Sequence, residues 1–112
     1  MSAVIEPTVL RGRSVLVDVT CTSPGGQEID HFQVRGVIEI VSERSIGIRR
    51  EGMSELYGLP PLFDRFRATE SDERLVWKRT GEELSVDYVV DFSVAVADAE
   101  MLLMVRSLGF QP

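Results

Sequence analysis

The sequence contains one cysteine and one histidine, and these shortages exclude several classes of site. A single thiol cannot build a disulfide framework or a zinc site of several cysteines. A single imidazole excludes a metal centre that needs two histidines. No run approaches about 18 uncharged apolar residues, so no transmembrane helix is expected. Glu6 and Pro7 interrupt the first ten residues, which are therefore unlike a signal peptide.

What remains is the composition of a small acidic globular protein with 112 residues and a formal charge of -6. We expect a single domain over residues 1–112, because two cores in so short a chain would each be too small to fold comfortably alone. The sequence has 21 Val and Ile against 10 Leu, and β-branched residues favour strands. Without a targeting segment, the expected location is cytoplasmic, with no membrane partner.

Alternating apolar residues predict a hairpin in the first third of the chain. The predicted strands cover residues 13–21 and 29–41, and the Pro- and Gly-containing residues 22–27 form the turn between them. One face of the second strand carries Phe32, Val34, Ile38 and Ile40. Gly36 lies on the same face, where it predicts a bulge or the close approach of another segment.

The rest of the chain predicts shorter strands, one long strand and a helix. Short strands are expected from Ile46, around residues 55–57 and over residues 74–79, while the prolines after Leu59 end pairing. Residues 62–70 fit an irregular crossover or one helical turn. The longest strand is predicted from Leu84 to about Ala97.

A helix is predicted over about residues 98–108, with Asp98 as its N-cap and Gly109 just after its end. Helical periodicity places five residues on its core face: Met101, Leu102, Met104, Val105 and Leu108. Leu103 falls on the polar face, where it has no intramolecular reason to be.

These elements predict a mainly β protein of the α+β class. About six antiparallel strands within residues 8–97 would curl into a small, partly open barrel or sandwich, with one C-terminal helix. The long last strand would be an exposed edge unless something covers it. Together with Leu103, this edge favours self-association, and we expect a homodimer.

Catalysis is not supported by the residues available. Cys21 and His31 could meet across the first hairpin as a nucleophile pair, but Cys21 continues an apolar stripe typical of a buried thiol. Asp87 and Asp91 lie four residues, or about 13 Å, apart on one strand, and convergence with Asp18 is left open. No phosphate-binding loop or serine-nucleophile motif is present. The expected protein is thus non-catalytic, with no cofactor and no metal.

Charge is unevenly distributed along the chain. Residues 44–67 carry a net +2, and residues 70–100 carry a net -6. The weak basic stretch is too small to indicate nucleic-acid binding. The acidic stretch suggests a basic protein partner, with candidate contacts at Glu82, Glu83, Asp87 and Asp91.

A stretch of large apolar residues surrounds the Pro-Pro break. It either forms a binding loop or oligomer contact, or caps the open end of the barrel or sandwich. Its candidate interaction residues are Leu56, Tyr57, Leu59, Leu62, Phe63 and Phe66.

Several short motifs within residues 35–94 resemble a pattern in uncharacterised small bacterial β-rich proteins. They are Gly36-Val37-Ile38, the Ile46/Ile48 strand, Leu59-Pro60-Pro61, and Thr80-Gly81-Glu82 followed by Asp87. The resemblance implies a bacterial source and a β-rich architecture, and it transfers no functional residue. The C-terminal helix has no counterpart in that pattern.

Three functional hypotheses follow from the sequence. The first is a non-catalytic interaction or assembly domain that self-associates. The second is an immunity- or antitoxin-type inhibitor that uses its acidic face against a basic partner. The third is a small-ligand-binding β-barrel or an unfamiliar enzyme, which would need a pocket lined by Asp18, His31 or Tyr88.

Overall fold

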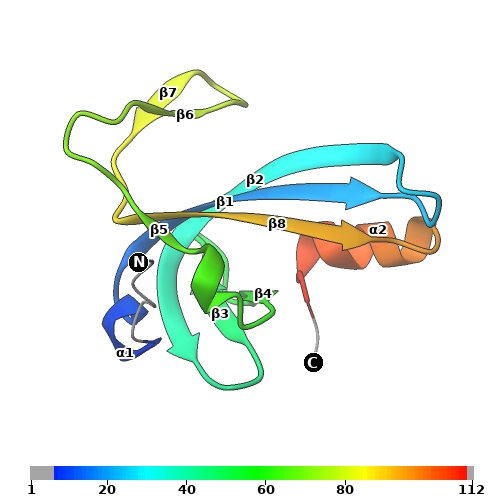
Figure 1. Ribbon diagram of the computed structural model, residues 1–112, viewed down its shortest axis with the longest axis horizontal. Coiled ribbons are helices and arrows are strands. Elements are labelled where there is room, and N and C mark those ends of the chain that lie inside the picture. Colours follow the sequence, from blue (N-terminus) through cyan, green and yellow to red (C-terminus); the bar gives the residue numbers. More distant parts are fainter. Residues whose placement is uncertain (1–6, 111–112) are drawn as a thin grey trace.

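A computed structural model describes residues 7–110, in which six strands form one mixed sheet in the order β4-β3-β2-β1-β8-β5 (Figure 1). The strands of this sheet are β1 (Ser14–Thr22), β2 (Glu28–Val41), β3 (Ile46–Arg49), β4 (Leu56–Leu59), β5 (Arg67–Ala68) and β8 (Tyr88–Ala95). A separate hairpin is formed by β6 (Leu75–Trp77) and β7 (Glu82–Leu84). The helices are α1 (Pro7–Leu10), the short 3₁₀ helix η1 (Phe63–Arg65) and α2 (Ala99–Ser107).

The predicted mainly β fold with a C-terminal helix is confirmed, but the sheet is not wholly antiparallel. β1 and β8 run parallel, from the pair Val15–Tyr88 to the pair Thr22–Ala95, whereas the other neighbours are antiparallel. The sheet is curved but not closed, because its end strands β4 and β5 do not pair with each other within residues 7–110. A closed barrel is therefore not what the described chain forms.

The position of β8 corrects in part the prediction that the last strand is an exposed edge. β1 lies along its whole length on one side, whereas β5 pairs only with its first two residues on the other, so residues 90–95 keep that edge without a strand partner within residues 7–110. Its predicted length is also wrong, since Glu82–Leu84 belongs to the separate hairpin. Two contacts from other parts of the chain hold the residues at the break: Thr69 donates its hydroxyl to the Val86 carbonyl (2.6 Å), and the Asp87 N–H donates to Ser14 Oγ (2.9 Å).

The core lies on the concave side of the curved sheet. Val15, Val17, Val19 and Cys21 of β1 are all fully buried, as the alternating pattern predicted. Residues from α1, β2, β3, β4, β8 and α2 belong to the same cluster, together with Phe66 and Val96. Leu16, on the opposite face of β1, is also buried but lies outside this cluster.

β2 confirms one detail of the sequence reading and corrects another. A Cβ added to Gly36 would lie 2.2 Å from the Arg49 carbonyl oxygen, so the predicted close approach is real. The ladder between β2 and β3 shifts register between Ile38 and Ile40. Because a bulge reverses the facing of later residues, Ile40 leaves the core face and is 44% exposed.

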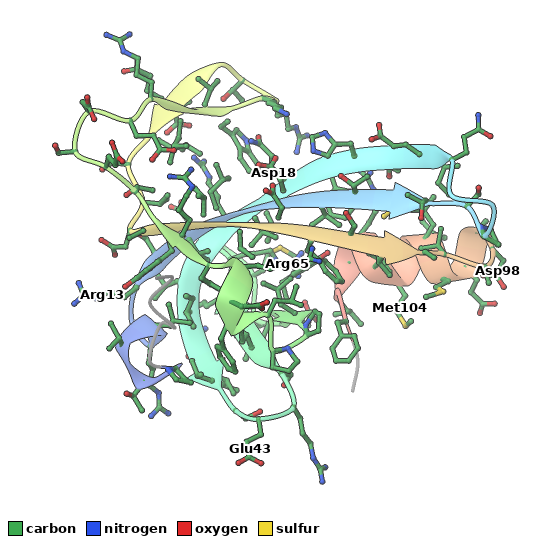
Figure 2. The ribbon with its side chains drawn as sticks, in the orientation of Figure 1. Arg13, Asp18, Glu43, Arg65, Asp98 and Met104 are labelled. Atoms are coloured by element: carbon green, nitrogen blue, oxygen red, sulfur yellow. The ribbon has the colours of Figure 1, made fainter. Side chains whose placement is uncertain are left out.

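The boundaries of α2 are close to those predicted, whereas its core face is narrower. Asp98 caps it by accepting from the Met101 N–H (2.8 Å), and Gly109 follows with φ of 74°. Val105 is buried and Met101 and Leu102 pack half-buried against the core, as predicted, whereas Met104 and Leu108 are exposed, which narrows the predicted apolar face. The helix lies beside the C-terminal end of β8, with Met104 pointing away from the sheet (Figure 2).

The segment around the Pro-Pro break packs into the molecule. β4 continues two residues beyond the predicted end, through Leu59, and stops at Pro60. Residues 62–70 contain η1, which fits the predicted helical turn, followed by β5, a two-residue strand that was not predicted. Beyond β4, the Phe110 N–H donates to the Gly58 carbonyl (2.8 Å), which attaches the C-terminal segment to this end of the sheet. No helix within residues 7–110 is long and apolar enough to cross a membrane.

Candidate functional site

The thiol and the imidazole do not form a catalytic pair. Cys21 is fully buried in the core, and burial, reinforced by the nearby Asp30 carboxylate, raises the pKa of its thiol above the ordinary value. His31 lies on the opposite face of the sheet, where its Nε2 is 3.5 Å from Asp18 Oδ1. A buried, protonated thiol on the other side of the sheet cannot be activated by this imidazole.

Two of the three aspartates considered from the sequence lie side by side. Asp18 and Asp91 are direct partners on the parallel strands β1 and β8. Asp87 lies farther along, where its carboxylate accepts from both the backbone N–H and the hydroxyl of Ser14 (each 3.1 Å). The described residues contain no group of three or more His, Cys, Asp or Glu side chains that could hold a metal ion.

The candidate acidic contacts are largely engaged within the molecule. Glu82 pairs with Arg35 (3.5 Å) and Glu83 with Arg74 (3.4 Å), both on or beside the β6–β7 hairpin. Asp87 is bound by Ser14, as described above. Asp91 is exposed on β8, so the four carboxylates do not form one free acidic surface.

The apolar candidates divide into core residues and one exposed residue. Leu103 is 65% exposed, the largest exposure among the exposed large apolar residues described. Five of the six candidates around the Pro-Pro break, all except Leu56, pack in or against the core, which fits the predicted cap better than a contact surface. Tyr57, Leu59 and Phe66 are buried, and Leu56, Leu62 and Phe63 are half-buried.

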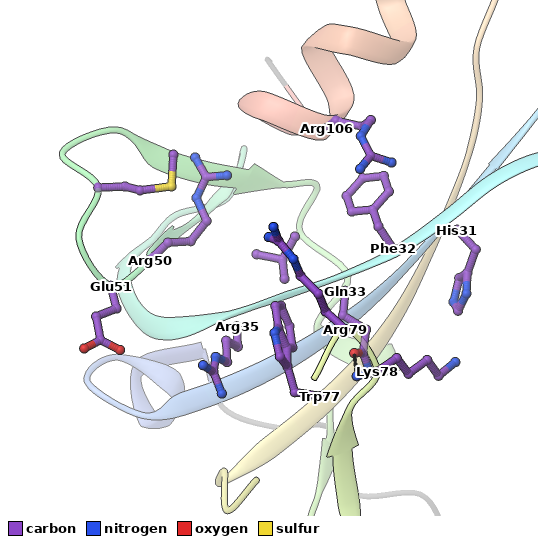
Figure 3. A pocket seen from close by; sticks show the side chains of 12 residues that line it. His31, Phe32, Gln33, Arg35, Arg50, Glu51, Trp77, Lys78, Arg79 and Arg106 are labelled. Carbon is purple, nitrogen blue, oxygen red and sulfur yellow. Dashed lines mark hydrogen bonds between the residues drawn. The ribbon is translucent and has the colours of Figure 1, made fainter. Parts of the chain in front are cut away.

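One concave site is a pocket of about 740 Å³ that gathers basic side chains from four parts of the chain (Figure 3). Arg35 comes from β2, Arg50 from the turn after β3, and Arg106 from α2. Lys78 and Arg79 come from the tip of the β6–β7 hairpin. We call this site the basic pocket. The remaining lining residues are His31, Phe32, Gln33, Val34, Glu51, Met53 and Trp77.

Three arginines of the basic pocket stack on aromatic rings. The guanidinium of Arg35 lies 4.7 Å from the ring centre of Trp77, and that of Arg106 lies 4.8 Å from the ring centre of Phe32. Arg50 lies 5.1 Å from the ring centre of Tyr57. Stacking fixes a guanidinium through its flat face and leaves its N–H groups in the plane available for an anion.

These arginines also contact groups of the protein, which hold them in place without using all their donors. Arg50 donates from Nη2 to the Ser107 carbonyl (2.7 Å), while its Nε is buried and has no hydrogen-bond partner in the described chain. Arg106 pairs with Asp30. An arginine fixed in this way loses less side-chain entropy when it binds a ligand.

A side-chain amide joins β2 to the hairpin that supplies Lys78 and Arg79, in addition to the contacts of Arg35 with Glu82 and Trp77. Gln33 donates from Nε2 to the Val76 carbonyl (3.1 Å) and accepts at Oε1 from the Lys78 N–H (2.7 Å). The amide thereby satisfies two backbone groups at the end of β6. This contact positions the hairpin tip beside β2 and keeps Lys78 and Arg79 at the pocket.

Lys78 and Arg79 are the unpaired cations of this site. Both are exposed, and neither side chain forms a hydrogen bond or ion pair with residues 7–110. Five basic residues line the pocket against one acid, Glu51. Even after Asp30 and Glu82 are counted as partners of Arg106 and Arg35, the site keeps an excess of positive charge.

Sequence reasoning missed this site because charge was summed over continuous stretches. Lys78 and Arg79 lie within the acidic stretch, and Arg35 and Arg106 lie outside the basic one. The one available signal was local: Trp77-Lys78-Arg79 places an aromatic residue beside two cations at a turn. No protein-family model, curated protein or solved structure matches the chain.

Proposed function

We propose that this protein is a non-catalytic binding module that captures an anionic partner in the basic pocket. The observation that carries the proposal is the convergence of five basic side chains at one concave site in a chain of formal charge -6. A protein of overall negative charge repels anions in general, so a local positive site selects those that fit it. The hypothesis of a ligand-binding β protein is thus developed with a specific site, in which His31 is one of the anticipated lining residues.

The pocket contains both fixed and adaptable cations. Arg35, Arg50 and Arg106 are held on aromatic rings, and they provide positive charge at defined positions. Lys78 and Arg79 are free to move toward an incoming anion. Because exposed charges are screened over about 8 Å at physiological ionic strength, binding that depends on them should weaken as salt is added.

The test uses inorganic tripolyphosphate and an acetylated tetraglutamate peptide as anionic probes, measured by isothermal titration calorimetry at low and high salt. The double variant Lys78→Glu/Arg79→Glu should weaken binding by about tenfold or more. The double variant Arg44→Glu/Arg65→Glu is the matched control, since it makes the same change in net charge at exposed positions outside the pocket. It should change affinity by no more than about twofold. Equal losses in both variants, or no binding of either probe, would refute the proposal.

Self-association through α2 is a second proposal, favoured by the exposure of Leu103 (65%) and Met104 (42%) on the same helix. Exposed apolar side chains next to one another favour contact with a second copy. Light scattering at tens of micromolar should then give the mass of a dimer. Leu103→Glu should return the monomer, whereas Val9→Glu, at an exposed apolar residue of α1, should not. A monomeric wild-type protein would exclude this proposal.

A further inference from the structure

The basic pocket lies along an unpaired strand edge. One edge of β2 pairs with β1 over residues 28–37. The opposite edge pairs with β3, but only from Val37 onward. Residues 28–36 therefore have one edge with no strand partner within residues 7–110. The pocket contacts five consecutive residues of this stretch, 31–35. Since consecutive side chains of a strand point to opposite faces, a pocket that contacts all five must lie beside the edge itself.

The hydrogen bonds of β2 show which backbone groups point into the pocket. The Ile38 N–H donates toward the β1 side, to the Arg13 carbonyl (2.9 Å). In an antiparallel ladder the direction alternates, so the even-numbered residues back to Asp30 also point toward β1. The N–H and C=O groups of His31, Gln33 and Arg35 consequently point to the free edge.

Most of these edge groups have no partner in the described chain. The His31 N–H is taken by the carboxylate of the adjacent Asp30 (2.8 Å). The N–H groups of Gln33 and Arg35 take part in no turn or loop hydrogen bond, and no neighbouring strand reaches them. Figure 3 shows the side chains on both sides of this edge, with Phe32 and Arg106 on one side of β2 and Gln33, Arg35 and Trp77 on the other.

We propose that the anionic partner is an acidic protein segment that enters the basic pocket in an extended conformation and pairs with the free edge of β2. This inference rests on the proposed function and specifies its ligand. The edge groups of β2 recur every two residues, or about 6.7 Å, which is the repeat of another strand. Backbone pairing would supply affinity, and acidic side chains alternating to the two faces would reach the cations on both sides.

The surroundings of the edge favour a single strand as the occupant. The β6–β7 hairpin flanks it on one side, and Arg50, Met53 and the Arg106 end of α2 flank it on the other. One extended chain needs less room beside the edge than another complete sheet does, so these flanks favour a single strand. A nucleotide could use the cations but not the repeated backbone groups, and Phe32 and Trp77 each already carry an arginine on one ring face.

The experiment compares three probes that share negative charge. The first is a capped seven-residue peptide in which pairs of consecutive glutamates are separated by single valines, so that an extended chain presents glutamates on both faces, and the second is the same peptide N-methylated at its five interior residues. N-methylation keeps the charge but removes the donors needed for strand pairing. The third probe is inorganic tripolyphosphate. Binding is measured by calorimetry, and amide hydrogen exchange of Gln33 and Arg35 is followed by NMR, with Phe32 and Val34 as internal controls because their amides already point to β1.

The proposal expects the unmodified peptide to bind about tenfold or more tightly than the N-methylated peptide, since two or three hydrogen bonds are lost. It also expects exchange of the Gln33 and Arg35 amides to slow by about tenfold or more, with Phe32 and Val34 unchanged. Equal binding of the two peptides without such protection would overturn strand pairing and leave anion capture intact. Binding of tripolyphosphate alone would also overturn it, in favour of a phosphate ligand. Failure of all three probes would remove the proposed function as well.

Discussion

The phenol of Tyr57 offers the sharpest test of how α2 is attached to the sheet. Tyr57 is fully buried on β4, and its hydroxyl donates to the Val105 carbonyl in the last turn of α2 (2.6 Å). Tyr57→Phe keeps the ring but leaves that carbonyl without this donor. The Val105 carbonyl still accepts from the Gly109 N–H (3.2 Å), so the variant loses one hydrogen bond, which costs about 0.5–1.5 kcal/mol. For a domain of this size, this corresponds to roughly 4 °C in Tm for each kcal/mol.

Urea denaturation followed by fluorescence or circular dichroism would measure the loss. Tyr88→Phe is the matched control: Tyr88 is half-buried, packs its ring edge-on against Phe66, and forms no hydrogen bond through its hydroxyl in the described chain. The free energy of unfolding of Tyr88→Phe should differ from that of the wild type by no more than about 0.5 kcal/mol. If both variants lose the same stability, the hydroxyl contact does not contribute as described.

The same residue predicts a pH dependence with a defined sign. Burial, and to a smaller extent the nearby Cys21, raises the pKa of Tyr57 above its ordinary value of 10. The folded protein therefore retains a proton that the unfolded chain loses above pH 10. This contribution to stability is complete below pH 10 and is lost as the pH rises further.

The advantage of the wild type over Tyr57→Phe should then shrink at alkaline pH. At about pH 11 the difference in free energy of unfolding should be smaller than at about pH 8 by roughly 1.4 kcal/mol, because the unfolded phenol is stabilised by ionisation. Titration of the other groups affects both proteins and cancels in the difference. A difference that stays constant from about pH 8 to about pH 11 would show that the phenol is not shielded from solvent.

Three further predictions follow from other contacts. Gln33→Ala removes both amide contacts to β6, so it should increase proteolysis and hydrogen exchange of residues 74–84 with little change in the global unfolding midpoint. Unchanged exchange of these residues would contradict the attachment. Gly36→Ala should lower the free energy of unfolding, measured by urea denaturation, by about 1–3 kcal/mol, since its Cβ would meet the Arg49 carbonyl. Gly25→Ala is the control and should be nearly neutral, because its Cβ meets nothing closer than 3.8 Å. Similar losses of stability in both variants would argue against the close approach. NMR titration should show that Glu73 has a pKa of about 2, lowered chiefly by its hydrogen bonds from Arg67. The stabilising effect of its carboxylate is then present above about pH 4.5 and lost toward pH 2. An unchanged pKa of Glu73 in Arg67→Leu would refute this cause.

Local patterns predicted the local structure well. The Pro-Gly-Gly turn and the alternation from Val15 to Cys21 specify the first hairpin, and Asp98 and Gly109 specify the two ends of α2. Such features depend on residues a few positions apart. The sequence therefore contains most of the information needed to place them.

Features that depend on distant residues were not predictable in the same way. The alternation through Val86 is continuous, but the strand breaks before Tyr88, where a bond from the Thr69 hydroxyl and a contact to Ser14 hold the chain. The parallel pairing of β8 depends on where the whole intervening chain leads it. Strand direction is not encoded in a period of two, so this pairing could not be read from the pattern.

The candidate site was the least predictable feature for the same reason. The cations of the basic pocket are brought together by sheet topology, by the bend of the chain after β3 and by the amide contact of Gln33. None of these follows from charge summed along the sequence. Nor does the free edge of β2, because it exists only where the shorter β3 ends.

The parallel pairing of β1 with β8 also constrains how the chain can fold. The first residues of this ladder are 73 positions apart in sequence, whereas β1 and β2 are joined by a short turn. During synthesis on the ribosome the hairpin of β1 and β2 can form early, but the outer edge of β1 has no partner until β8 has emerged. Contacts of such long sequence separation slow folding and prolong the exposure of strand edges. The nascent chain therefore spends most of its synthesis with the centre of its future sheet open to association with other chains.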